Sequence, residues 1–330
     1  MSKLNVHDNT KIYVACPANF ATGGPELLHQ LVYHLNTFGL NAYMYYYNNT
    51  SENPVHPAYR QYNNPWITTI EDKQENILIV PEVKTDLIYK YKNIQKVIWW
   101  LSVDNFYNFL SKNPLKKLIK YFLWKVGIYG IYNFNKNDEI VHFVQSEYAK
   151  QYLLSKGITN IQFLGDYLNK YFIEKQTQNI NKEKKDIVVY NPKKGIEFTK
   201  KIIENAKDIK FIPIENMTRE EVAELLSTAK VYIDFGNHPG KDRIPREAAI
   251  SGCCVITGKR GSAKYYKDVP IPDKYKFSDK EKNIPKIIEK IKYIMKNYEV
   301  VTKDFDNYRK SIKNEEKQFI NDIKKIFYIK

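Results

Sequence analysis

Val231–Ala263 has the sequence VYIDFGNHPGKDRIPREAAISGCCVITGKRGSA, and the order of its apolar, polar and helix-forming residues determines the fold that we expect. The apolar runs Val231–Phe235 and Cys253–Thr257 predict two buried strands. Between them, Pro245 suits the first turn of a helix, where its missing N–H has no partner to lose, and Gly252 ends that helix. The stretch therefore predicts a βαβ unit of a parallel sheet.

A polar loop joins the first of these strands to the helix. Ligands of open parallel sheets bind beyond the carboxyl ends of the strands, so a ligand is expected at this loop. The loop combines basic, acidic and small residues, namely His238, Gly240, Lys241, Asp242 and Arg243. This combination predicts an anionic ligand that also carries hydroxyl groups, and a nucleotide sugar fits that description.

The helix and the second strand resemble a motif of a known enzyme family. The pattern E-A-x-x-x-G-x-x-V-I is matched by Glu247, Ala248, Gly252, Val255 and Ile256. It is similar to the donor-binding half of GT-B glycosyltransferases, in particular the family-4 (glycosyl transferase group 1) retaining enzymes of bacterial surface-polysaccharide synthesis. The resemblance implies an α/β protein with two Rossmann-like domains facing across a cleft. It also implies that Glu247, expected in the first helical turn, binds the donor ribose; the alternative is a carboxylate favoured by the helix dipole.

The chain departs from the family pattern at one position. Family-4 enzymes have a second glutamate eight residues before the first, and this chain has Pro239 there. The resemblance therefore leaves open whether the anomeric configuration is retained or inverted. It also leaves open a nucleotide-sugar-binding or glycan-binding protein without turnover.

Alternating strands and helices extend this pattern along the chain. The expected strands are Lys11–Ala15, Ala42–Tyr47, Asn76–Val80, Lys96–Leu101, Ile140–Gln145, Asn160–Leu164, Ile187–Tyr190 and Lys210–Pro213. The expected helices are Glu26–Phe38, Glu147–Lys156, Glu197–Asn205 and one that runs from a capping box at Thr218 and Glu221 to about Ala229. The proline-containing stretch Asn48–Pro65 is expected to be a loop.

These elements predict two domains and a connection between them. We expect a Rossmann-like acceptor domain over residues 1–173, a lysine-rich linker over 174–186 and a nucleotide-sugar-binding domain over 187–300. Helical spacing continues from Ile284 to Lys330. In the GT-B fold such a tail commonly packs back across the first domain, which the resemblance implies for residues 301–330.

Composition narrows the cellular setting. The start of the chain lacks the apolar segment of a signal peptide, and Cys16, Cys253 and Cys254 show no disulfide framework or metal-ligand spacing. A cytoplasmic protein with reduced thiols is therefore expected. The net charge of +15 requires an explanation, because it favours anionic partners.

The stretch Ser111–Lys136 contains six lysines, several aromatic residues and no acidic residue. This composition favours a peripheral element on an anionic membrane surface, and it is too interrupted by lysine to cross a bilayer. The alternative is a solvated helix whose aromatic side chains face the core. Nucleic-acid binding is not expected, because no nucleic-acid-binding module is recognisable.

Two further segments suit a diphosphate. Gly23, Gly24, Pro25 and Glu26 lie between the first strand and the first helix and resemble the G-G-x-E loop of family-4 enzymes, which approaches the donor phosphates and sugar; a plain turn with a cap is the alternative. Lys193 and Lys194 follow the first strand of the second half, where they would stabilise the leaving group; two solvated lysines are the alternative.

Other polar residues at strand ends complete the predicted site. Trp100 and its neighbour Trp99 suit stacking on an acceptor sugar, and Asp104 is a candidate general base or a helix cap. Asp166 either lines the cleft or caps a turn. Asn216 and Met217 lie where such folds hold the base.

The remaining candidates concern phosphate contacts and metal. His238 could donate to a phosphate or a sugar, or be polar surface, and Ser262 lies in a loop whose backbone N–H groups suit phosphate. No histidine, cysteine and carboxylate cluster shows metal-site spacing, and no D-x-D motif follows a strand. We therefore expect no metal and no cofactor apart from the donor.

Together these features predict a glycosyltransferase that moves a sugar from a nucleotide-diphosphate sugar, with UDP favoured, to a hydroxyl of a glycan or lipid-linked acceptor. The alternatives are a sugar-nucleotide epimerase or phosphorylase with the same fold, the binding protein named above, and an enzyme that glycosylates DNA.

Overall fold

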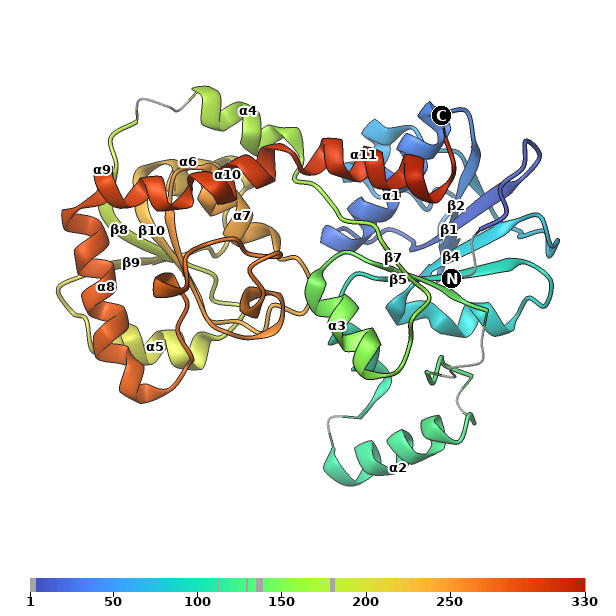
Figure 1. Cartoon of the computed structure of the whole chain (residues 1–330), viewed down its shortest axis with the longest axis horizontal. Coiled ribbons are helices and arrows are strands. Elements are labelled where there is room, and N and C mark those ends of the chain that lie inside the picture. The colour runs from blue at the N-terminus through green and yellow to red at the C-terminus, as the bar shows by residue number, and fades with distance from the viewer. Residues whose placement is uncertain (1–3, 112, 129, 135–138, 179–181, 330) are drawn as a thin grey trace. The chain divides into compact units, whose positions relative to one another are not determined.

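The computed structural model describes residues 4–111, 113–128, 130–134, 139–178 and 182–329 (Figure 1). The chain forms two compact units. One contains the residues up to Asp166 together with those from Lys317, and the other runs from Tyr167 to Glu316. Each unit has its own parallel sheet and hydrophobic core.

The described part of the first unit has a seven-stranded sheet with the order β3-β2-β1-β4-β5-β6-β7. The strands are β1 (Lys11–Pro17), β2 (Asn41–Tyr47), β3 (Trp66–Ile67), β4 (Ile77–Pro81), β5 (Gln95–Trp100), β6 (Val141–Val144) and β7 (Ile161–Phe163). The helices are α1 (Gly23–Thr37), α2 (Pro114–Lys125) and α3 (Glu147–Ser155), with 3-10 helices η1 (Pro57–Tyr62), η2 (Glu82–Tyr89) and η3 (Asn105–Phe109). The β4 strand is fully buried, as expected for a central strand covered on both faces.

The second unit has a sheet of four described strands in the order β11-β10-β8-β9. They are β8 (Lys185–Tyr190), β9 (Lys210–Pro213), β10 (Ala229–Asp234) and β11 (Cys254–Thr257). Its α-helices are α4 (Lys170–Gln178), α5 (Ile196–Glu204), α6 (Arg219–Thr228), α7 (Arg243–Ile250), α8 (Ile284–Lys296), α9 (Tyr298–Val301) and α10 (Asp306–Lys313), and its 3-10 helices are η4 (Gly261–Lys264), η5 (Asp273–Tyr275), η6 (Glu281–Asn283) and η7 (Thr302–Phe305).

Helix α11 (Glu315–Ile326) begins in the second unit and continues into the first. Within the first unit, Phe319 stacks on Trp99 with 6.5 Å between ring centroids and meets the ring of His34 edge-on at 5.7 Å. The ring of Phe327 meets the ring of Phe143 edge-on, with 6.3 Å between centroids. Residues far apart in the sequence therefore share one core.

The β10–α7–β11 unit predicted from Val231–Ala263 is confirmed, with β10 and β11 paired in parallel from Val231 opposite Cys254. The capping box at the start of α6 is also confirmed, because Thr218 accepts from the Glu221 N–H at 3.2 Å and the Glu221 carboxylate accepts from the Thr218 N–H at 2.7 Å. One detail is wrong: α7 begins at Arg243, which puts Glu247 in the second helical turn.

The stretch 174–186, expected to be a linker, is largely structured where it is described; residues 179–181 lie outside the described part. Helix α4 extends to Gln178 and β8 begins at Lys185. The ammonium of the partly buried Lys184 donates to the carbonyls of Leu226 (3.1 Å) and Ser251 (2.7 Å), at the ends of α6 and α7. A cation is favoured there because the carboxyl ends of helices are negative. The two units divide at Asp166 and Glu316, whereas the sequence analysis expects domain boundaries at 173, 186 and 300.

Among the described residues, no helix combines the length and the hydropathy needed to cross a bilayer.

Candidate functional site

The order of strands in the second sheet identifies where a ligand would bind. The chain runs from β8 to β9 on one side, and then places β10 and β11 on the other. The strand order therefore reverses between β8 and β10, and the crevice beyond the carboxyl ends of two such strands is the usual ligand site of an open parallel sheet. The loops that follow these strands contain Lys193, Lys194 and residues 235–242.

Glycines allow three loops to approach closely at this edge. Gly195, with φ +62°, has no room for a β-carbon, which would overlap the carbonyl of Phe235. Gly261, with φ +50°, would overlap the carbonyl of His238 in the same way. Only glycine combines this backbone conformation with such close contact. The loops after β8, β10 and β11 are thus packed backbone against backbone.

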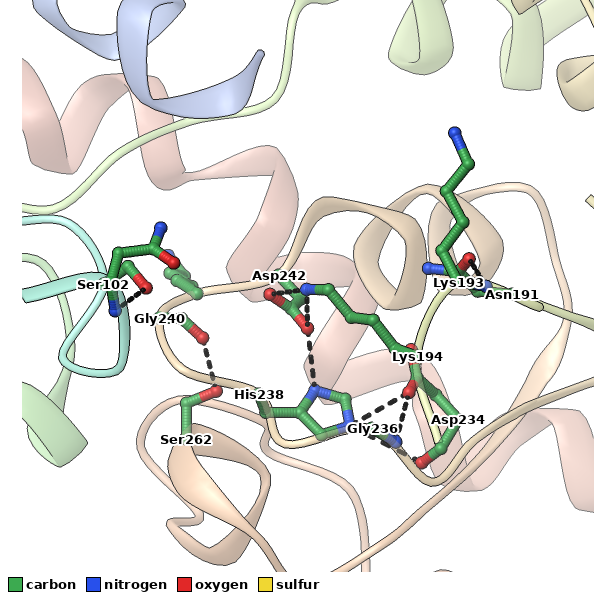
Figure 2. Close-up of polar contacts among 12 residues, drawn as sticks. Ser102, Asn191, Lys193, Lys194, Asp234, Gly236, His238, Gly240, Asp242 and Ser262 are labelled. Atoms are coloured by element: carbon green, nitrogen blue, oxygen red, sulfur yellow. Dashed lines mark hydrogen bonds and ion pairs between the residues drawn. The ribbon is translucent and has the colours of Figure 1, made fainter. Parts of the chain in front are cut away.

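Charged side chains connect two of these loops (Figure 2). The ring of His238 lies between two carboxylates, with Nε2 at 3.3 Å from Asp234 Oδ1 and Nδ1 at 3.3 Å from Asp242 Oδ2. From the loop after β8, Lys194 Nζ donates to both oxygens of Asp242, at 2.9 and 3.0 Å. The four side chains form one continuous network across the crevice between β8 and β10.

The protonation of His238 follows from these partners. Burial alone lowers the pKa of the imidazole, but Asp234 and Asp242 outweigh burial and raise the pKa to about 10. Burial raises the pKa of Asp242, but His238 and Lys194 hold it below its usual value. With His238 protonated, the formal charges of the two aspartates, the histidine and the lysine sum to zero.

Two predicted roles at this network are wrong. His238 is not polar surface, and both of its ring nitrogens face carboxylates, so neither is directed to a phosphate or sugar. Ser262 is also committed within the fold, because its N–H donates to the His238 carbonyl at 2.9 Å and its hydroxyl donates to the Gly240 carbonyl at 2.7 Å. Both residues hold the loop in place.

The structure also brings together a histidine and two aspartates that the sequence analysis did not identify as a cluster. In the described part of the chain, Asp234, His238 and Asp242 form a group of three potential metal ligands with their ligand atoms within 4.8 Å of one another. The spacing of four residues between them is the signal that could have identified it. Because the two ring nitrogens face different carboxylates, one ion could not occupy both positions, and the geometry suits an imidazolium better than a metal ion. The absence of a metal stays a prediction.

A second ion cluster fixes the start of α7. Arg246 is completely buried, with NH1 at 2.8 Å from Glu315 Oε2, and it donates to the carbonyls of Lys241 (3.0 Å) and Asp242 (3.2 Å). Lys241 Nζ lies 2.8 Å from the other Glu315 oxygen. Lys241 therefore contacts Glu315 in this structure. Nothing in the sequence distinguishes the buried Arg246 from an ordinary exposed helix residue.

The other predicted donor-binding residues of the second unit are exposed or partly buried. Lys193 is exposed, and its N–H donates to Asn191 Oδ1 at 3.0 Å. Arg243 is the first residue of α7 and Glu247 the fifth, and both are partly buried. Asn216 is exposed, and Met217 is partly buried between β9 and α6.

In the first unit the strand order reverses between β1 and β4, and α1 begins directly after β1. Gly23 and Gly24 open α1, and the buried carboxylate of Glu26 in its first turn accepts from the Tyr62 hydroxyl at 3.3 Å. Glu82 follows β4 and was missed by the sequence analysis. Burial raises the pKa of Glu82 to about 7. Hydrogen bonds from backbone N–H groups, including those of Leu101 and Ser102, favour the charged carboxylate and oppose that rise.

The predicted acceptor residues separate into buried and exposed positions. Trp100 is completely buried, and its indole donates to His142 Nδ1 at 3.0 Å, so its predicted stacking on a sugar is wrong. Trp99 is equally buried. Asp104 is exposed at the N-cap position of η3 and makes no side-chain capping bond there. Asp166 is buried at the end of the first unit's main segment.

Comparison with known proteins adds independent observations. The chain is 27% identical over 261 residues to an alpha-1,6-glucosyltransferase of Actinobacillus pleuropneumoniae serotype 7 (strain AP76), covering 76% of this chain and 73% of the relative. No protein-family model matches the chain.

Solved structures of low sequence identity share the fold. Sucrose-phosphate synthase of Thermosynechococcus elongatus superposes with a TM-score of 0.67 at 12% identity, covering 97% of this chain and 98% of the other. Alr3699/HepE of Anabaena in complex with UDP gives 0.57 at 10% identity, covering 97% of each chain. WaaG, a glycosyltransferase involved in lipopolysaccharide biosynthesis, gives 0.56 at 12% identity over 96% of this chain and 99% of the other.

Proposed function

We infer that this chain, which has the GT-B fold, is a glycosyltransferase that transfers a sugar from a nucleotide-diphosphate sugar, with UDP-sugar favoured, to a hydroxyl of a glycan or lipid-linked acceptor. The observation that carries this proposal is the charge-balanced network between Lys194, Asp234, His238 and Asp242 at the crevice between β8 and β10. The likeness to a glucosyltransferase and to a UDP-bound structure supports it.

The neutral network has a direct consequence for an anionic donor. Two carboxylates at the carboxyl edge of the sheet would repel a diphosphate. The imidazolium and the ammonium cancel that charge, so the positive N-terminus of α7 and the side chains of Lys193 and Arg243 can attract the phosphates. These groups would stabilise the charge that develops on the departing nucleotide diphosphate.

The remaining roles follow from exposure and position. Glu247, one turn further along α7 than Arg243, would accept from the ribose hydroxyls. Asp104 is an exposed carboxylate at the carboxyl end of β5 and would take the proton of the acceptor hydroxyl as general base. Glu26 would address the reacting sugar only after leaving its contact with Tyr62. We place the reaction in surface-polysaccharide assembly at the cytoplasmic face of a bacterial membrane.

The test begins with ligand binding and then measures turnover. A ligand that binds only the folded state raises the melting temperature. We expect UDP, but not GDP, CMP or ADP, to raise Tm equally with and without EDTA. UDP-sugars incubated with glycan or lipid-linked acceptors should then release UDP. A UDP-induced shift with no release across the acceptors would overturn the enzymatic proposal in favour of a binding protein.

Glu247 gives the sharper test of the site. Glu247→Ala should raise the donor KM more than about tenfold, with little change in Tm, because it removes a charged hydrogen-bond acceptor worth roughly 1.5–3 kcal/mol. Glu197→Ala, which removes an exposed glutamate from the first turn of α5, is the matched control. Equal donor KM values in the two variants would exclude Glu247 from the donor site.

A further inference from the structure

Local signals mark the start of helix α2. Asn113 caps it, with its side-chain oxygen accepting from the N–H groups of Leu115 (3.1 Å) and Lys116 (3.2 Å), and Pro114 occupies the first helical position. Both features stabilise a helix start without any tertiary contact. The start of the helix is thus specified by residues adjacent to it in the sequence.

Trp124 is the buried side chain of α2 that packs against the rest of the first unit. Trp124 is buried, its indole donates to the Tyr132 carbonyl at 2.7 Å, and its ring lies 5.9 Å from Phe106 and 5.7 Å from Phe109. On the same side of the helix, Lys120 donates to the Phe109 carbonyl at 3.3 Å. The inward face is therefore narrow and defined by Trp124.

The opposite face is apolar and exposed. Leu115, Leu118 and Phe122 are 69%, 67% and 65% exposed, and Ile119 and Val126 complete a stripe at helical spacing. Soluble monomers rarely present contiguous apolar patches of this kind. The alternative in which the aromatic residues of this segment face the core holds for Trp124, Tyr132 and Phe134 but not for Tyr121 and Phe122. Lys112, Tyr129 and Lys136 of the same segment lie outside the described residues.

Lysines border the apolar stripe. On a helical projection with 100° per residue, the exposed Lys116 and Lys125 fall on opposite sides of the stripe, whereas Lys117 falls near Trp124 on the other face. No acidic residue occurs in α2. In a symmetric pair of copies these lysines would face their own equivalents, which disfavours a second chain as the partner. Anionic headgroups above an apolar layer complement both the stripe and its borders.

We propose that α2 docks the protein in the plane of a membrane that contains anionic lipid. The stripe of Leu115, Leu118, Ile119, Phe122 and Val126 enters the boundary between headgroups and acyl chains, while Lys116 and Lys125 bind anionic headgroups. Trp124 holds the helix in that orientation beforehand, so docking requires no folding of the segment. This surface acts independently of the donor site, so its failure would leave the proposed transfer reaction untouched.

The experiment is co-sedimentation of the full chain with vesicles of phosphatidylethanolamine and phosphatidylglycerol, compared with vesicles of phosphatidylcholine. We expect binding to the anionic vesicles that weakens with salt. The double variant L118D/F122D should lower the partition coefficient more than about tenfold. The control Y266D/V300D changes two similarly exposed apolar residues elsewhere and should bind like the unmodified chain.

A charge variant tests the lysines without altering the stripe. K116Q/K125Q should weaken binding about fivefold per lysine at low salt. K310Q/K313Q on α10, which removes the same charge from exposed positions, should have little effect. Equal binding to both vesicle types, or no vesicle binding by the unmodified chain, overturns the proposal. A dimer in light scattering that L118D/F122D disrupts, without vesicle binding, would assign the stripe to a second copy.

Discussion

His142 in the first unit and His238 in the second are both completely buried, yet His142 is neutral and His238 is positively charged. Burial lowers the pKa of His142 to about 3, and the pKa of His238 is raised to about 10 because two carboxylates outweigh burial. The indole of Trp100 can only donate, so Nδ1 of His142 accepts and its proton lies on Nε2, facing the Tyr132 hydroxyl at 3.2 Å.

The difference shows that burial keeps a histidine neutral unless carboxylate partners outweigh it. His142 is a neutral polar link between the aromatic side chains of the first core. His238 is a cation that makes two aspartates tolerable at the edge of the second sheet. The two histidines can therefore be separated experimentally by substitution and by pH.

The largest expected effect comes from replacing each histidine with a neutral residue. His238→Gln leaves the buried Asp234 and the partly buried Asp242 without their shared cation and should lower the free energy of unfolding by about 3–5 kcal/mol. His142→Gln disturbs neutral hydrogen bonds and should cost only about 1–3 kcal/mol. Urea denaturation at pH 7 measures both. Equal losses of unfolding free energy in the two variants would mean that His238 is uncharged. Adding D242N to H238Q should recover part of the stability that H238Q loses, because it removes one of the two carboxylates that shared the cation.

The pH dependence of stability should differ in sign between the two. The folded state keeps the His238 proton up to about pH 10, while the unfolded chain releases it near 6.5, so stability from His238 is complete below 6.5 and is lost as the pH rises to 10. For His142 the folded pKa is about 3, so its contribution is complete above 6.5 and is lost as the pH falls toward 3.

The measurement is the difference in urea midpoint between the unmodified chain and each glutamine variant from pH 4 to pH 10. The difference for H238Q should shrink toward pH 10, and the difference for H142Q should shrink toward pH 4. A pH-independent difference for H238Q would contradict the imidazolium. Adding zinc at pH 8 should not raise the midpoint of the unmodified chain, since an ion would have to displace the ring proton.

The smallest effect concerns the two adjacent lysines. Lys194→Met removes a partly exposed ammonium from Asp242 and should lower stability by about 1 kcal/mol, because solvent screens part of the interaction. Lys193→Met removes an exposed side chain and should change stability by less than about 0.5 kcal/mol. Thermal unfolding in low salt compares them. Because Lys193 is proposed to contact the donor phosphates, Lys193→Met should raise the donor KM more than Lys194→Met does.

Regular elements could be predicted from the sequence because their signals are local. The β10–α7–β11 unit follows from two apolar runs separated by Pro245 and closed by Gly252, and the α6 start follows from Thr218 and Glu221. Helix α4 was missed because its apolar residues are few and close together: Tyr171, Phe172 and Ile173 pack on the second core in an otherwise polar segment.

The site was predicted less completely because its interactions are non-local. His238 was recognised as part of the loop, but its charge depends on Lys194 and on two carboxylates brought to it by backbone turns. Trp100 has the composition of a sugar-binding residue and is buried by contacts with Phe106 and His142. The outward direction of α2 likewise depends on which face Trp124 anchors.

The way the chain divides has a consequence for how the protein is made. The first unit includes Phe319 and Phe327, which pack on Trp99 and Phe143, but a ribosome produces them only after the whole second unit, Tyr167–Glu316, has been synthesised. The second unit is continuous and can close as soon as it emerges. The part of the protein that is translated first is therefore completed last, and until then its aromatic core is open to chaperones and proteases.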